Sequence, residues 1–214
     1  MKRAAWLVLF VSGCVSSSLA VLRLQSQSGA AVEITARALQ PGEMLLAVFL
    51  PSSDGQDAKL TFLDRDYPFF SGGPGGKKLA LVGIDFLAEP GSYRVEAVFR
   101  DGGGNTEIVH EHIRLHARSY SRQNIALDEK LVTAPPEVEE RLAQERRILA
   151  EVYRSFVPEW LGSGDFLAPL PDKPSPNFGE HRSYNGVPRS RHTGVDISAE
   201  SGAPVLASNS ASPE

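Results

Sequence analysis

The sequence predicts a mainly β protein with a single α-helix. Apolar and polar residues alternate with a period of two in several stretches between residues 21 and 118, and turn sequences rich in Gly and Pro separate those stretches. One later stretch, starting near Thr133, has the apolar period of a helix instead. The 214 residues are 42% hydrophobic and 22% charged, which excludes a fibrous or wholly disordered chain. The net charge of −4 gives no sign of the basic surface that a nucleic-acid partner requires.

Residues 1–20 have the pattern of a secretory signal peptide. A basic start at residues 2–3 precedes an uncharged apolar run, and the small residues that end at Ala20 suit a cleavage site. The apolar run is shorter than the roughly 20 residues of a membrane-spanning helix. The residues that end in Cys14 also resemble the lipobox of bacterial lipoproteins, so cleavage after Ala20 and lipidation of Cys14 both stay open. Either way we expect export to the periplasm or the extracellular space, with membrane attachment only if Cys14 is lipidated.

The first folded unit, residues 21–118, is expected to be a small antiparallel β-sandwich. Its clearest strand is 92–100, in which Tyr93, Val95 and Phe99 share one face. The expected strands are 31–36, 44–50, 58–67, 78–85, 92–100 and 107–117. About six or seven short strands with Gly and Pro turns match an immunoglobulin-like sandwich in size. The Cys…Trp…Cys framework of antibody domains is missing, so the domain is not of that type.

Residues 119–176 are expected to form one helix and a Pro-rich linker. Thr133 and the prolines that follow it suit a helix start, and we expect the helix to end before Pro158. Opposite charges recur four residues apart along this stretch and support a solvated helix surface. The repeated prolines between residues 162 and 176 indicate an extended connector rather than a core element.

The last segment, residues 177–214, contains the candidate site. This segment is too short for an independent core, because a fold of fewer than roughly 40 residues usually needs additional cross-links. His192 and Asp196 are four residues apart, so in an extended chain both side chains point to the same side, with Gly194 leaving room between them. A neutral imidazole and a carboxylate are good zinc ligands. The spacing therefore predicts a pair of metal ligands, although taken alone it also arises by chance.

The sequence around this pair resembles a known enzyme family. The matching elements are Phe178-Gly179-x-x-Arg182, a short Gly-Pro loop, Arg191-His192-Thr193-Gly194-Val195-Asp196-Ile197, and Gly202-x-Pro204-Val205-x-Ala207. Together they are similar to the start of the lysostaphin/LytM-type zinc metallopeptidases, which are bacterial cell-wall endopeptidases with a compact antiparallel β core. The match covers residues 177–207. The β domain, helix and connector before it also resemble accessory regions of exported members.

The resemblance implies zinc as the cofactor and the peptide stems of peptidoglycan as the substrate. His192 and Asp196 map onto two of the family's three protein ligands for zinc. The family takes its third ligand, from a His-x-His motif, and a His that acts on the attacking water from later strands, whereas no His follows His192 here. We therefore expect a C-terminally truncated chain that holds the incomplete start of the metallopeptidase core, has no assigned catalytic or substrate-binding residue, and is inactive alone. A non-catalytic envelope-binding or regulatory module is the alternative.

A second group of histidines lies near the end of the β domain. His110, His112 and His116 share one face of the last expected strand, where a His-x-His pair can in principle bind a metal. No Cys or carboxylate is expected to complete that set. Ile113 and Leu115 alternate with these histidines, so a polar outer face of the sandwich is the preferred interpretation.

Overall fold

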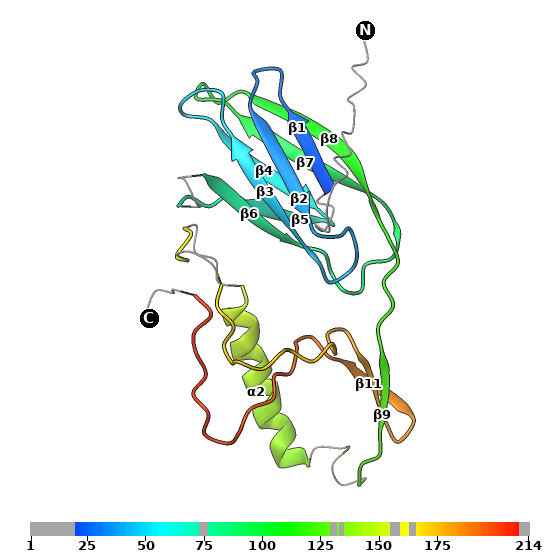
Figure 1. Cartoon of the computed structure of the whole chain (residues 1–214). Coiled ribbons are helices and arrows are strands. Elements are labelled where there is room, and N and C mark those ends of the chain that lie inside the picture. The colour runs from blue at the N-terminus through cyan, green and yellow to red at the C-terminus, as the bar shows by residue number, and fades with distance from the viewer. Residues whose placement is uncertain are drawn as a thin grey trace.

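The computed structural model describes residues 20–72, 77–128, 132, 135–154, 159–162 and 166–209. The rest of the predicted signal peptide, with Cys14, lies outside these residues. The prediction of a mainly β protein is confirmed, because the strands form three sheets and are accompanied by one long helix. Figure 1 shows the two larger sheets packed together at one end of the molecule, with the helix and a small sheet at the other end.

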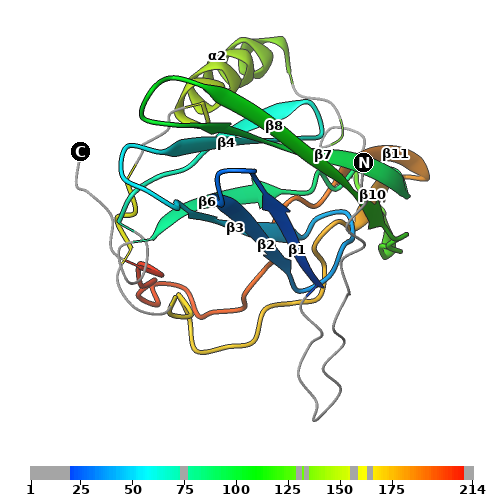
Figure 2. The ribbon, with the colours of Figure 1, turned by 90° about the horizontal axis from the view of Figure 1, so that it is seen from above.

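Residues 20–115 form a sandwich of two antiparallel sheets. One sheet has the strand order β1-β2-β3-β6, and the other has the order β5-β4-β7-β8. The first consists of β1 (Ala20–Gln25), β2 (Ala31–Ala36), β3 (Met44–Leu50) and β6 (Lys78–Gly83). The second consists of β4 (Asp57–Phe62), β5 (Arg65–Pro68), β7 (Gly91–Arg100) and β8 (Thr106–Leu115). Figure 2, viewed from above, shows the two sheets as separate layers.

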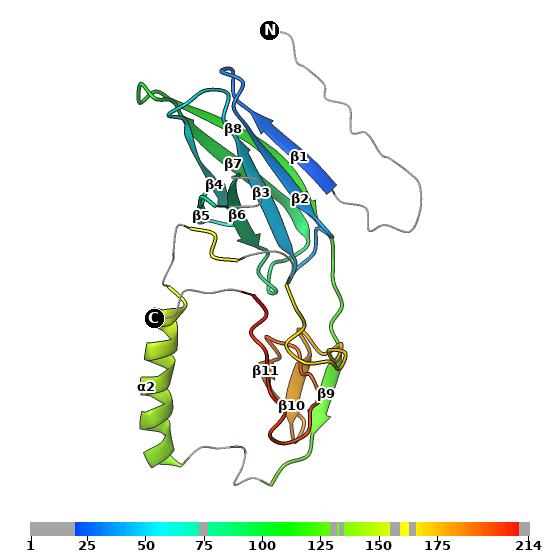
Figure 3. The same ribbon diagram turned by 60° about the vertical axis from the view of Figure 1, so that its left-hand side comes forward.

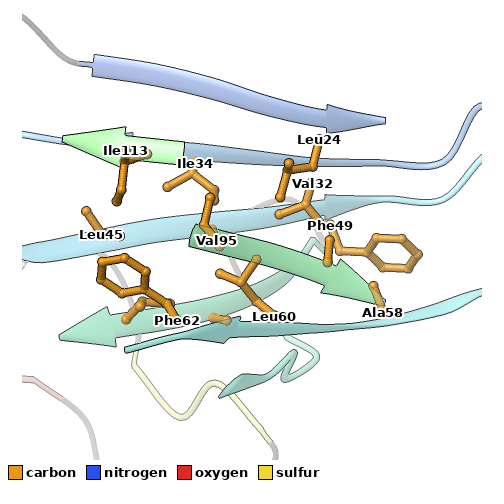
Figure 4. Close-up of a cluster of buried hydrophobic side chains, with 14 of the residues drawn as sticks. Leu24, Val32, Ile34, Leu45, Phe49, Ala58, Leu60, Phe62, Val95 and Ile113 are labelled. Atoms are coloured by element: carbon orange, nitrogen blue, oxygen red, sulfur yellow. The ribbon is translucent and has the colours of Figure 1, made fainter. Parts of the chain in front are cut away.

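The period of two in the sequence places the hydrophobic core between these layers. In β3, Leu45, Ala47 and Phe49 are buried, while the residues between them are only half-buried. The buried cluster runs from Leu24 to Leu115, and no described residue outside the sandwich belongs to it. Figure 4 shows its side chains meeting between the sheets. The sandwich therefore has a hydrophobic core of its own.

The single strand expected at 58–67 is a hairpin of two strands instead. Leu63 and Asp64 form its two-residue turn, with φ of +50° and +58°. Positive φ at both turn positions is the type I′ geometry that joins twisted antiparallel strands, and Gly or Asn is its usual sequence signal. The turn residues are Leu and Asp instead, so the usual Gly or Asn signal for the break is missing here. Across the hairpin, Asp66 accepts a hydrogen bond of 2.7 Å from Lys59 Nζ.

The helix α2 (Pro136–Val152) agrees with the expected helix and ends before Pro158. Its first turn contains proline, which is tolerated there because the first backbone N–H groups of a helix have no partner within it. Several of its apolar side chains are poorly buried, since Ile148, Leu149 and Val152 are each at least half exposed. Within the described part of the chain, no helix is long and apolar enough to cross a bilayer.

A small third sheet brings the C-terminal segment beside the chain that leaves the sandwich. Its order is β11-β10-β9, formed by β9 (Arg122–Ile125), β10 (His181–Tyr184) and β11 (Val187–Arg191). Strand β10 pairs antiparallel with β11 and parallel with β9. Strand β9 lies in segment 119–176, for which we expected only a helix and a linker. The sequence did not predict this strand, because its largely exposed residues show no apolar alternation. Figure 3 shows the three strands side by side, next to the sandwich.

Truncation of Phe49 tests the sandwich core. Its ring is 1% exposed and lies 5.8 Å from the ring of Phe69 and 6.3 Å from that of Phe99, measured between centroids. We expect Phe49→Ala to lower the free energy of unfolding by about 3–5 kcal/mol, because it removes buried apolar surface and leaves a cavity. Urea unfolding followed by circular dichroism measures this. Ile108→Ala, at a side chain that is 57% exposed, is the control and should change stability by no more than about 0.5 kcal/mol. Equal losses in the two variants would contradict the assigned core.

Candidate metal site

Two aromatic rings dock the C-terminal segment onto the sandwich through close contacts with glycine. Gly42, before β3, and Gly179, before β10, have φ of +79° and +77°, a region that favours glycine. A Cβ at Gly179 would lie 2.2 Å from Cδ1 and Cε1 of Tyr120, and a Cβ at Gly42 would lie 2.5 Å from Cε1 of Phe178. Tyr120 Oη also donates a hydrogen bond of 2.8 Å to the carbonyl of Pro41. We call Gly42, Tyr120, Phe178 and Gly179 the aromatic joint.

Arg118 covers the aromatic joint with its guanidinium. Its Cζ lies 5.3 Å from the ring centre of Tyr120 and 5.7 Å from that of Phe178, which are cation–π distances. The same guanidinium donates hydrogen bonds to the Pro41 carbonyl at 3.2 Å and to Glu43 Oε1 at 3.0 Å. Burial raises the pKa of the Tyr120 hydroxyl, so that group stays a donor at neutral pH.

Backbone hydrogen bonds connect the aromatic joint to His192 and fix the position of its backbone. Gly179 N–H donates to the His192 carbonyl at 2.7 Å, and His192 N–H donates to the Glu180 carbonyl at 2.9 Å. The β10–β11 hairpin that separates them turns at Asn185 and Gly186, both with positive φ, which is a usual pair for a two-residue turn. The Asn185 side chain bonds the backbone N–H and carbonyl of Leu127, each at 2.9 Å, and so ties the hairpin to the chain after β9.

The structure brings the two predicted ligands, His192 and Asp196, together. His192 Nε2 and Asp196 Oδ1 lie 3.4 Å apart. The His192 side chain is 17% exposed, and its Nε2 is buried and makes no hydrogen bond, whereas the Asp196 side chain is 61% exposed. Nitrogen and oxygen ligands at about 2.0–2.2 Å from a tetrahedral zinc lie roughly 3.3–3.5 Å from each other. The separation and the unsatisfied buried nitrogen therefore fit two ligands of one metal ion.

Side chains from the start of the segment hold the Asp196 carboxylate. Asn177 Nδ2 donates to Asp196 Oδ2 at 2.6 Å, and Arg182 Nη2 lies 3.5 Å from the same oxygen. The backbone of Asp196 is fixed as well, because its N–H donates to Asn177 Oδ1 at 3.3 Å and its carbonyl accepts from Ser175 N–H at 2.8 Å. These contacts occupy Oδ2 and leave Oδ1 facing His192. Groups that orient a ligand in this way commonly strengthen metal binding.

The metal chemistry that His192 and Asp196 can support is limited, because they are only two protein ligands. Within the residues that the structure describes, no group of three or more His, Cys, Asp or Glu side chains is placed to hold a metal ion. The pair therefore supplies two protein ligands and leaves the other positions of a tetrahedral ion to water or to further groups. A site of this kind can bind a divalent cation weakly.

The other histidine group does not form a site in the described structure. His110, His112 and His116 are all exposed, and the rings of His110 and His112 lie 6.3 Å apart in an edge-on arrangement. His110 Nδ1 faces Arg94 Nη2 at 3.4 Å, which places a positive charge where a cation would have to bind. These positions agree with a polar outer face of the sandwich.

Sequence reasoning gave no positioning role to the residues that hold the pair, although Arg182 belongs to the Phe178-Gly179-x-x-Arg182 motif. Asn177 and Arg182 reach Asp196 across 19 and 14 positions of the chain, a distance at which no local period gives a signal.

Comparisons with protein-family models and with curated proteins found no match to this sequence.

Substitution at Gly179 tests whether the aromatic joint positions His192. Gly179→Ala places a methyl group against the Tyr120 ring and also requires φ of +77°, so we expect local stability to fall by about 2–5 kcal/mol. Gly186→Ala is the matched control, because its φ is +81° and nothing lies within 4 Å of the added Cβ; we expect a loss of about 1–2 kcal/mol. Hydrogen exchange of the His192 amide measures both losses. If the two variants lose the same protection, the joint does not set the position of His192.

Proposed function

We propose that the protein is an exported member of the lysostaphin/LytM lineage of bacterial cell-wall zinc endopeptidases, with His192 and Asp196 as two of its zinc ligands. The observation that carries this proposal is the buried, unbonded His192 Nε2 at 3.4 Å from Asp196 Oδ1, with Asn177 bonded to Oδ2 of the same carboxylate. The pair lies inside the only stretch with the family's motif, residues 177–207. The β-rich unit ahead of it is the type of accessory region that exported members carry.

The residues of the site have distinct parts in this proposal. His192 offers a neutral nitrogen from a mostly buried position, and Asp196 offers a carboxylate oxygen toward the solvent. Asn177 and Arg182 hold the second carboxylate oxygen and prevent the side chain from turning away. When bound, zinc would polarise the carbonyl of a peptide cross-link and lower the pKa of a bound water. The substrate class, the peptide stems of peptidoglycan, comes from the resemblance.

The His residues that the family uses for the remaining steps of such catalysis have no counterpart after His192 in this sequence. A catalytic zinc takes about three protein ligands and an open position for water. A second group must accept the proton of the attacking water, and no His follows His192. We therefore propose that the chain of 214 residues binds zinc but does not cleave peptides by itself.

A zinc titration tests the ligand assignment. In calorimetry with metal-free protein, we expect the wild-type chain to bind one zinc ion, and His192→Ala or Asp196→Ala to weaken binding at least tenfold, because each removes one of two ligands. Asn177→Leu should weaken it about tenfold through loss of the carboxylate contact. His112→Ala, at the exposed alternative group, is the control and should leave the affinity unchanged. An unchanged affinity in His192→Ala, or a loss confined to His112→Ala, would make the assignment wrong.

An assay on wall peptides tests the proposed lack of activity. Purified cross-linked peptidoglycan is incubated with the zinc-saturated chain, and new amino groups are counted against a metal-free blank. We expect no release above the blank, because the described residues place no third ligand beside the pair and no His follows His192 to accept the proton of the water. Release that depends on zinc and disappears in His192→Ala would show that the chain is an active peptidase.

An envelope-binding or regulatory module is the second candidate, and one observation favours it. The hydrophobic core of the sandwich lies wholly between Leu24 and Leu115, so this unit is built independently of the metal pair. Cosedimentation of the full chain with purified peptidoglycan separates the candidates. Binding that is the same for the wild type and for a His192→Ala/Asp196→Ala variant favours the module, whereas binding lost in that variant favours recognition through the metal site.

A further inference from the structure

One face of the small sheet carries a row of basic side chains. In the strand register, His181 of β10 is paired with Arg191 of β11 on one side and with Arg122 of β9 on the other. Residues directly opposite each other on neighbouring strands point to the same face of a sheet. With strands about 4.8 Å apart, the two arginines flank His181 at a Cα separation of roughly 10 Å. We call Arg122, His181 and Arg191 the basic row; β9, β10 and β11 lie side by side in Figure 3.

A β-bulge adds a fourth basic residue to this region. The register between β10 and β11 shifts after Arg182, so that Arg189 has no partner residue on β10. Such bulges re-aim a side chain and are frequent beside functional sites. Arg189 and the basic row line one groove of about 700 Å³, whose wall also includes Phe86 from the loop between β6 and β7.

Of the arginines that line this groove, only Arg182 is ion-paired among the described residues, with Glu180 and Asp196. In the described part of the chain, no ion pair joins Arg122, Arg189 or Arg191 to a carboxylate. Glu180, which precedes His181 in the chain, bonds Arg182 and Ser121 instead.

The loop with Asp85 and Phe86 lies beside the basic row. Asp85, next to Phe86, accepts a hydrogen bond of 2.9 Å from the backbone of Leu87, and the Arg191 guanidinium lies 5.8 Å from the Phe86 ring centre. Partial burial, followed by the charges of Arg191 and Arg122, lowers the pKa of His181 below its ordinary value. The same positive field would attract an anion.

Strand alternation directs the basic row to one face of the hairpin and Arg182 to the other, although Arg182 also lines the groove. Arg182 follows His181 in β10, so its side chain points to the other face, where it reaches Asp196. A ligand of the row and a metal at His192 can therefore bind separately. Like charges placed opposite each other across strands destabilise a sheet, so protonation of His181 between the two arginines costs stability unless an anion binds there.

We propose that the groove over Arg122, His181 and Arg191 is a binding site for a polyvalent oxyanion, a ligand that presents at least two phosphate or carboxylate groups. A guanidinium binds such groups with two parallel hydrogen bonds, and two arginines whose Cα atoms lie roughly 10 Å apart offer two such contacts, which suits a ligand with repeated charges better than a single small ion. Phe86 gives the groove an apolar wall against which the uncharged part of the ligand can lie.

Calorimetry with two probes tests the proposal on the metal-free full chain. Tripolyphosphate represents the phosphate source and tricarballylate the carboxylate source. We expect the wild type to bind at least one of them, and an Arg122→Gln/Arg191→Gln variant to bind it at least tenfold more weakly. The probe that binds more tightly identifies the source of the oxyanion. Arg114→Gln, at an exposed arginine of β8, is the matched control and should stay within twofold of the wild type.

The pKa of His181, measured by NMR on the same samples, gives an independent readout. A bound anion favours the charged imidazolium, so the pKa should rise when the tighter-binding probe is saturating. Without any probe, the double variant should also show a raised pKa, because two positive charges are gone, and the probe should then raise it no further. The proposal is overturned if neither probe binds, if Arg114→Gln loses as much affinity as the double variant, or if saturating probe leaves the pKa of His181 unchanged.

Discussion

The contact of Tyr120 and Phe178 with Gly42 and Gly179 is the constraint on which the candidate site depends. No side chain larger than hydrogen fits at the two glycines without displacing a ring, and Arg118 covers both rings. The buried core includes no described residue beyond the sandwich, so the segment after Phe178 has no comparable core of its own. Its order comes from this docking and from the short ladder that continues it. His192 is bonded directly to the joint, because its carbonyl accepts from Gly179 N–H, and its own N–H donates to the Glu180 carbonyl.

The small sheet separates two kinds of chemistry on its two faces. On one face, His192 and Asp196 offer a neutral nitrogen and a carboxylate oxygen, which suits a cation. On the other, arginines flank His181 without a carboxylate partner, which suits an anion. Arg182 points toward the cation face, where its charge is shared between Glu180 and Asp196. That sharing lets an arginine lie beside a carboxylate that is also a proposed metal ligand.

The sequence was sufficient where the signal is local. Strands β2 and β3 have the predicted bounds, because buried residues alternate with partly exposed ones along each of them. The His192–Asp196 pair was predicted for the same reason, since four residues of extended chain bring both side chains to one side. Three features had no local signal. The turn at Leu63 and Asp64 lacks Gly and Asn, β9 lacks apolar alternation, and the basic row exists only because β9 pairs with a strand more than fifty positions later.

The central claim is that His192 and Asp196 bind the same metal ion. Anomalous diffraction at the zinc edge, from crystals of the full chain grown with zinc, tests it most directly because it locates the ion without reference to activity. The account predicts a peak about 2.0–2.2 Å from both His192 Nε2 and Asp196 Oδ1, with Asn177 still bonded to the other carboxylate oxygen. A peak at His110 and His112, or none near His192 at saturating zinc, would contradict it.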